Sequence, residues 1–147
     1  MHFRPRIVIL GGGFAGAYCA QSLEKHLAGR GAEVSLINES NYFIFSPLLI
    51  EAGTGSLEPR HAVVPLRAFL RSTRFIMAAV RGVDLDLQRV GYRLWASAHD
   101  DEVPYDHLVV ALGSITRLPA VPGGKNADSV PPHPGRFGLD LGFLLFP

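Results

Sequence analysis

The sequence predicts an α/β fold in which a parallel sheet carries a small antiparallel meander. Three observations lead to this class. Short apolar, β-branched runs recur along the chain, as in parallel strands that are buried on both faces. A glycine-rich turn and a helical pattern join the first two runs, which makes a βαβ unit. A later run alternates apolar and polar residues, which is typical of a half-exposed antiparallel strand.

The βαβ unit occupies residues 6–38. Arg6–Leu10 is the first expected strand, and the glycine-rich segment Gly11–Gly16 follows it directly. A helical pattern then continues to about Ala28, with its apolar positions on one face. Glu33–Asn38 is the second expected strand. This order is that of a Rossmann-like fold.

The middle of the chain supplies the rest of the sheet. Residues 39–60 are expected to form a loop, and Pro65–Arg71 a short helix with proline in its first turn. Five further elements are predicted: a third strand at Arg74–Val80, meander strands at Val83–Leu87 and Val90–Ala96, a turn at Asp100–Glu102, and a buried strand at Leu108–Leu112.

The end of the chain has a different composition. Six of the 11 prolines lie between Pro119 and Pro147, and such a segment forms neither a helix nor a central strand. Leu139–Phe146 is apolar, but no element follows with which it would pair. We therefore expect an incomplete Rossmann-like domain at residues 1–122 and a disordered or irregular tail at 123–147. A frameshift is the simplest cause of such a tail.

Composition excludes several classes of protein. The 147 residues are 48% hydrophobic and 18% charged, which is incompatible with a disordered chain. The 14 basic and 13 acidic residues give no electrostatic basis for binding nucleic acid. Cys19 is the sole cysteine, so a disulfide within the chain is excluded, and we expect a packed or half-exposed helix thiol. The histidines show no paired spacing, so no metal site is expected.

The sequence also bears on the membrane and the compartment. No apolar run reaches the roughly 18 residues that a membrane span needs. The amino-terminal residues lack the apolar segment and cleavage site of a secretory signal. We therefore expect a cytoplasmic or cytoplasm-facing protein.

The glycine-rich turn has the spacing of a dinucleotide-binding motif. Gly11 permits a tight turn, Gly13 lets a pyrophosphate approach the backbone, and Gly16 lets the helix pack closely on the sheet. The helix N-terminus presents free N–H groups and a partial positive charge to phosphates. Glu39, 28 positions after Gly11, is placed to accept hydrogen bonds from ribose hydroxyls, and Asn38 can share that role.

Several longer stretches share a resemblance to one family. They are Ile7–Ala20, Asn41–Leu49 with Ala52–Leu57, Glu58–His61 with Pro65–Arg67, and Tyr105–Ser114. Together they resemble the type II NADH:quinone oxidoreductases, which are single-subunit NADH dehydrogenases of the FAD/NAD(P)-binding superfamily. The resemblance covers roughly residues 5–122, with Leu112 in place of the family's threonine.

The resemblance implies an FAD-binding domain and assigns its contacts. The reduced flavin would receive hydride from NADH and pass electrons to quinone, so no side chain here is expected to be catalytic. In this family an acid is more common at the position of Asn38. The implied contacts are Gly11, Gly12, Gly13, Phe14, Ala15 and Gly16 for the pyrophosphate, Asn38 and Glu39 for the ribose, Ala79 and Val80 for the adenine, Thr54 and Gly55 toward the flavin, and Ala111 and Gly113 along the cofactor.

Other family features are absent from these residues. There is no second GxGxxG motif for NADH and no Gly-Asp pair for the flavin side of FAD. We therefore expect a truncated FAD-binding portion that lacks NADH dehydrogenase activity alone, with one strand position of its sheet empty. A full-length enzyme would associate peripherally with the cytoplasmic face of a membrane. The alternatives are a non-catalytic module for FAD or ADP-ribose, an NAD-binding dehydrogenase domain, and an inactive fragment that does not fold.

Overall fold

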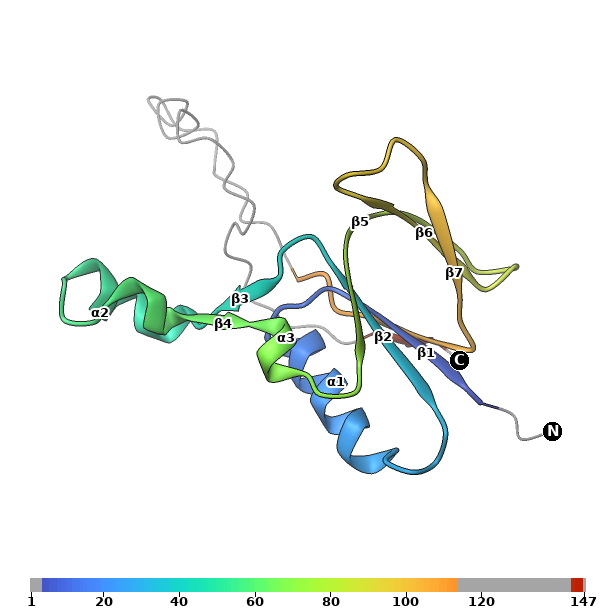
Figure 1. Ribbon diagram of the computed structural model, residues 1–147, viewed down its shortest axis with the longest axis horizontal. Coiled ribbons are helices and arrows are strands. Elements are labelled where there is room, and N and C mark those ends of the chain that lie inside the picture. Colours follow the sequence, from blue (N-terminus) through green and yellow to red (C-terminus); the bar gives the residue numbers. More distant parts are fainter. Residues whose placement is uncertain (1–3, 114–143, 147) are drawn as a thin grey trace.

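A seven-stranded mixed sheet forms the body of the molecule (Figure 1). The computed structural model describes residues 4–113 and 144–146. The strands, in spatial order, are β7 (Asp101–Pro104), β6 (Arg89–Leu94), β5 (Arg74–Asp84), β2 (Glu33–Asn38), β1 (Arg6–Leu10), β8 (His107–Val110) and β9 (Leu144–Phe146). The predicted α/β class is therefore confirmed.

The parallel part of the sheet contains β5, β2, β1 and β8. β1 pairs with β2 on one side and with β8 on the other, in register from Ile7 to Leu10. Helix α1 (Phe14–His26) connects β1 to β2 and packs on one face of the sheet. Both strands of this βαβ unit have the bounds that the sequence predicts, because their apolar runs are short and end at glycine or polar residues.

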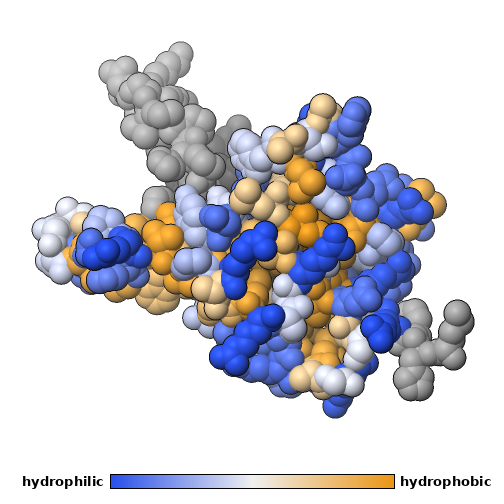
Figure 2. Space-filling model, viewed as in Figure 1, coloured by the Kyte–Doolittle hydropathy of each residue, from blue (hydrophilic) through white to orange (hydrophobic). Residues whose placement is uncertain are grey.

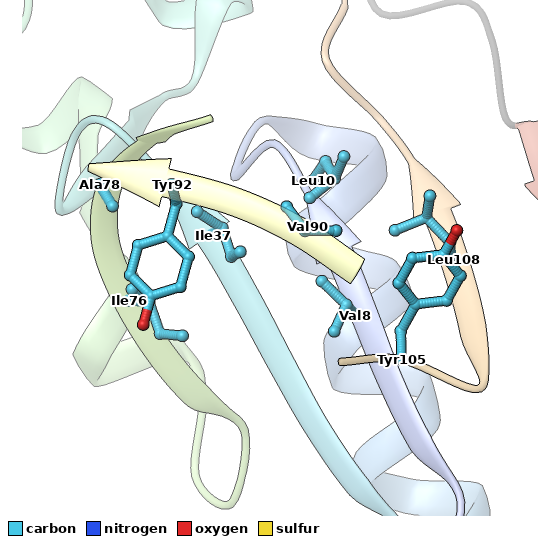
Figure 3. Packing of buried hydrophobic residues seen from close by; sticks show 9 residues of the cluster. All are labelled: Val8, Leu10, Ile37, Ile76, Ala78, Val90, Tyr92, Tyr105 and Leu108. Carbon is cyan, nitrogen blue, oxygen red and sulfur yellow. The ribbon is translucent and has the colours of Figure 1, made fainter. Parts of the chain in front are cut away.

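The two faces of β1 are buried against different partners. Ile9 points to the face that α1 covers, where it packs with Ala17 and Ala20. Val8 and Leu10 point to the opposite face, where Val90 of β6 lies over them and Tyr92 of the same strand lies beside Ile37 and Ile76 (Figure 3). The meander therefore curls over the face opposite α1. This two-sided burial explains why β1 is apolar at consecutive positions.

The meander differs in its bounds from the prediction. Of the expected strand at Val83–Leu87, only Val83 and Asp84 are in a strand, as the end of β5, which continues through a bulge between Val80 and Gly82. Residues 85–87 lie in the turn to β6 instead. The acidic pair Asp101 and Glu102, predicted as a turn, lies in β7 instead. β7 is the outermost strand at this end of the sheet, and charged side chains are tolerated on such an edge.

Residues 42–69 form an arm that extends from the body and returns to it beside α1 (Figure 1). Its elements are β3 (Tyr42–Ile44), η1 (Ser46–Leu48), α2 (Leu49–Gly53), η2 (Pro59–Ala62), β4 (Val63–Pro65) and α3 (Leu66–Phe69). The expectation of a loop over 39–60 is therefore wrong, and the predicted helix at Pro65–Arg71 is shorter. Elements of three to five residues produce no periodicity that the sequence could reveal.

The edge of β8 carries a further strand. Leu144–Phe146 pairs antiparallel with β8, in register from Leu108 to Val110. The expectations that this apolar segment has no partner and that the strand position stays empty are therefore wrong. An open strand edge offers unpaired N–H and C=O groups, which a short apolar segment can satisfy. The rest of the predicted irregular tail, residues 123–143 and 147, lies outside the described residues.

Two carboxylates connect elements that are distant in sequence. Asp106 accepts hydrogen bonds from Nε, a terminal nitrogen and the backbone N–H of Arg6, at 3.1, 2.9 and 2.7 Å. The Arg6 guanidinium lowers the pKa of Asp106 from 3.8 to about 2. Glu24 on α1 accepts hydrogen bonds from the backbone N–H groups of Arg71, Ser72 and Thr73. Burial opposes ionisation of Glu24, but these donors outweigh it and lower its pKa.

Candidate functional site

The strand order reverses between β1 and β8. From β1 the chain passes to β2 and β5 on one side, and then returns to β8 on the other side. In open α/β sheets, ligands bind outside the carboxyl ends of the strands at such a reversal. Gly11 and Ala111, which follow β1 and β8, meet at this point. A ligand of this fold is therefore expected at the carboxyl edge of the sheet.

The glycine turn is tightly packed, so two of its glycines cannot carry a side chain. Gly11 has φ +97°, and a Cβ there would overlap the carbonyl oxygen of Ala111. A Cβ on Gly16 would overlap the carbonyl oxygen of Gly11. The Gly11 N–H donates to the carbonyl of Ile37 at 2.9 Å, which ties the turn to β2. The sequence-based roles of Gly11 and Gly16 agree with this geometry.

Asn38 supports the middle of the turn. Its Oδ1 accepts a hydrogen bond of 2.8 Å from the Gly12 N–H, and its Nδ2 donates to the Ser40 carbonyl at 2.8 Å. A Cβ on Gly12 would lie 2.9 Å from Cγ of Asn38 and 2.7 Å from Cδ1 of Leu66. Both ends of the Asn38 amide are therefore engaged within the protein. Glu39, the next residue, is exposed.

The first turn of α1 presents backbone donors. Gly13 is its N-cap residue and has no side chain with which to cap the helix. Among the described residues, no protein acceptor meets the N–H groups of Phe14, Ala15 and Gly16. The turn also contains no acidic residue, so the positive end of the helix dipole is not neutralised. A phosphate group fits such a site.

The Phe14 side chain serves a structural purpose, which the sequence did not reveal. Its ring contacts Phe43 and Phe45 edge to face, at centroid distances of 5.4 and 5.3 Å. Phe69 contacts both Phe43 and Tyr18 in the same way. This aromatic cluster joins α1 to the arm. Phe14 can therefore contribute its backbone N–H to a ligand while its ring holds the helix in place.

The remaining predicted site residues divide into two groups. Ala79 and Val80 lie on β5 beyond Met77, where the pairing with β2 ends. They are therefore at the same edge as the glycine turn. Gly113 follows Ala111 there, with φ +71°. Thr54 and Gly55 are instead exposed at the end of α2, which packs on η1 and η2 in the arm (Figure 1).

Trp95 is a residue at this edge that the sequence did not single out as functional. Its Nε1 donates a hydrogen bond of 3.2 Å to the carbonyl oxygen of Glu39, although the two residues are 56 positions apart. Apolar side chains are exposed at several places on the molecule (Figure 2), so exposure alone does not distinguish Trp95. Trp95 is distinguished by its hydrogen bond to Glu39, the residue that follows β2.

Other features lie away from this edge. A cavity of about 360 Å³ is at the opposite end of the sheet, where Arg6, Glu33 and Arg74 line it. Cys19 is half-buried beside the core under α1, as expected of a packed thiol, and burial raises its pKa. Within the described ranges there is no cluster of three or more metal-ligating side chains. No helix in this part of the chain is long and apolar enough to cross a membrane.

The sheet, its order reversal and the glycine turn define a Rossmann-like α/β protein with the motif of dinucleotide-binding domains. The family model for pyridine nucleotide-disulphide oxidoreductases matches residues 5–133. The chain belongs to this family.

Relatives in sequence show which members of the family the chain resembles. The chain is 35% identical over 128 residues to the demethylphylloquinone reductase NdbB of Synechocystis, and 29% identical over 125 residues to a type II NADH:quinone oxidoreductase of Staphylococcus aureus. Each match includes 84% of this chain, but the chain spans only 31% and 30% of those relatives.

Solved structures support the fold. The structure of NDH2 from Plasmodium falciparum in complex with NADH superposes with a TM-score of 0.70 at 23% identity, and covers 84% of this chain and 25% of its own. The sulfide:quinone oxidoreductase of Aquifex aeolicus superposes with a TM-score of 0.63 at 26% identity, and covers 74% of this chain and 24% of its own. The predicted resemblance to type II NADH:quinone oxidoreductases is therefore confirmed.

Proposed function

We propose that the chain binds FAD at the carboxyl edge of β1, β2 and β8, as the FAD-binding portion of an NADH:quinone oxidoreductase. The observation that carries this proposal is the glycine turn. It directs the N–H groups of Phe14, Ala15 and Gly16 to a point where no described acceptor meets them. The name of one relative supports the choice of NADH and quinone, and the resemblance to type II NADH:quinone oxidoreductases supports the choice of FAD.

The chain's residues would share the dinucleotide between them. The pyrophosphate would accept hydrogen bonds from the first turn of α1, where the helix dipole also favours an anion. Glu39 would accept hydrogen bonds from the ribose, because its carboxylate is exposed while the Asn38 amide holds the turn. Ala79 and Val80 would line the adenine with their backbone. Ala111 and Gly113 would pass beside the cofactor, and Thr54 and Gly55 are proposed to lie toward the flavin.

The chemistry would belong to the cofactor. When bound, FAD would supply the redox chemistry between NADH and an acceptor such as quinone. The residues described here would bind and orient the dinucleotide, and none is assigned a proton transfer. Because the chain spans about 30% of its relatives' length, binding and turnover are separate questions for it.

Titration of the full chain with FAD tests the proposal. The change in flavin absorbance is expected to saturate at one FAD per chain, and NADH is expected to compete weakly. Binding of NADH in preference to FAD would favour the NAD-binding alternative, and absence of FAD binding would contradict the proposal. In an NADH-to-quinone assay with added FAD, we expect no turnover from these 147 residues. Rapid turnover would show that the chain contains a complete enzyme.

A further inference from the structure

Trp95 combines exposure with a fixed position. Its side chain is 68% exposed, yet its Nε1 is hydrogen-bonded to the carbonyl oxygen of Glu39. The bond holds one edge of the indole against the end of β2 and leaves much of the ring open. The donor nitrogen is already used, so any ligand at this ring would be recognised through its aromatic surface and not through the indole N–H.

The loop that carries Trp95 is braced at both ends. The Ser97 N–H donates to the carbonyl of Leu94 at 3.0 Å, which closes a turn directly after β6. Arg93 and Asp100 form an ion pair of 2.6 Å across the base of the loop. The ring is therefore positioned before a ligand arrives, which lowers the entropic cost of binding.

The place of Trp95 in the sheet relates it to the glycine turn. Neighbouring strands at the carboxyl edge follow the order β1, β2, β5 and β6. Asn38, at the end of β2, pairs with Met77, and Ala78 pairs with Leu94, the residue before Trp95. A dinucleotide with its pyrophosphate at α1 and its ribose at Glu39 would therefore have its base next along the same edge, at the indole.

We propose that Trp95 stacks on the adenine base of FAD and is a positioning residue for the adenosine half of the cofactor. The inference rests on the proposed FAD binding. Adenine presents a flat π-face, and stacking on an aromatic side chain needs no further hydrogen bond. The prediction is a selective one, because FMN has the flavin and a phosphate but no adenosine.

Dissociation constants of FAD and FMN for three variants test the role. Trp95→Ala should weaken FAD binding roughly tenfold or more, in line with the contribution of base–aromatic stacking. Trp95→Phe keeps an aromatic surface and should remain within about threefold of the wild type. Leu87→Ala is the matched control, since Leu87 is also 68% exposed but lies in the turn between β5 and β6. It should leave the FAD affinity unchanged, and FMN should bind wild type and Trp95→Ala alike.

Fluorescence gives an independent readout, because Trp95 is the sole tryptophan. ADP contains the adenosine half of FAD but no flavin to absorb the emitted light. Titration with ADP should therefore quench Trp95 emission saturably, through contact with the base. Far-UV circular dichroism and thermal unfolding of each variant verify that the fold is intact.

The outcomes separate the two proposals. If the wild type binds FAD and Trp95→Ala binds it equally well, stacking is excluded and FAD binding stands. If Trp95→Ala weakens FAD and FMN equally, or lowers the unfolding temperature markedly, Trp95 has a structural role and the inference is wrong. If the wild type binds neither FAD nor ADP, both the proposed function and the stacking role are excluded.

Discussion

Replacement of Asp106 by asparagine should destabilise the fold in a pH-dependent way. Asp106 follows β7 and is paired with Arg6 at the start of β1, so it closes the connection from the meander back to the parallel sheet. A pKa that falls from 3.8 to about 2 on folding corresponds to roughly 2 kcal/mol of stability at neutral pH. The Arg6 side chain is 43% exposed, so solvent screening reduces the expected loss to about 1–1.5 kcal/mol.

The sign of the pH dependence follows from the direction of the shift. The folded-state pKa of Asp106 is depressed, so its contribution is complete above the ordinary value of 3.8 and is lost as the pH falls toward about 2. The difference in free energy of unfolding between wild type and Asp106→Asn should therefore be largest at pH 7 and shrink below about pH 4. Urea unfolding followed by far-UV circular dichroism at pH 7, 5, 4 and 3 measures it. A difference that stays constant over this range, or is absent at pH 7, would refute the reasoning.

Three further predictions concern the glycine turn and α1. Gly16→Ala should cost about 2 kcal/mol of stability and abolish FAD binding in titration, because its Cβ overlaps the Gly11 carbonyl. Gly53→Ala is the control, and it should be neutral or slightly stabilising because the space around its Cβ is open. Asn38→Leu should lower the free energy of unfolding by about 1–2 kcal/mol and weaken FAD binding, because the Gly12 N–H loses its acceptor. Asn38→Asp retains an acceptor and should lose less of both. Equal stability and FAD affinity of the two variants would contradict the role of Asn38 as the acceptor for Gly12. Glu24→Ala should lower the free energy of unfolding by about 2 kcal/mol at pH 7, and Glu24→Gln should lower it less. Urea unfolding should show both losses of stability fading as the pH drops below about 4. A loss of stability that persists at low pH would exclude the charged carboxylate as the acceptor.

The sequence was most informative where a pattern has one physical meaning. Arg6–Leu10 and Glu33–Asn38 are consecutive apolar runs next to glycine or polar residues, and the structure confirms both strands. The glycine spacing likewise predicted a tight turn at Gly11 and close packing at Gly16, and in the structure a Cβ at either position would overlap a backbone carbonyl. These local features can be predicted from the sequence because each depends only on residues that are close together in the chain.

Contacts between distant residues were not predictable in the same way. The arm at residues 42–69 depends on aromatic packing between Phe14, Phe43 and Phe69, which no periodicity signals. The engagement of the Asn38 amide by the Gly12 N–H and the bond from Trp95 to Glu39 depend on how β2, α1 and β6 meet. A tryptophan at the end of an alternating strand indicates only a half-exposed position until the sheet is assembled.

The central claim is that the first turn of α1 binds the pyrophosphate of FAD. Amide proton chemical shifts of the isotope-labelled chain, followed by NMR during addition of FAD, test it most directly. The N–H groups of Phe14, Ala15 and Gly16 should show large downfield shifts that saturate at one equivalent, as donors to an anion do. Unchanged shifts there, or the largest changes at Glu33 and Arg74 beside the cavity at the opposite edge, would contradict the account.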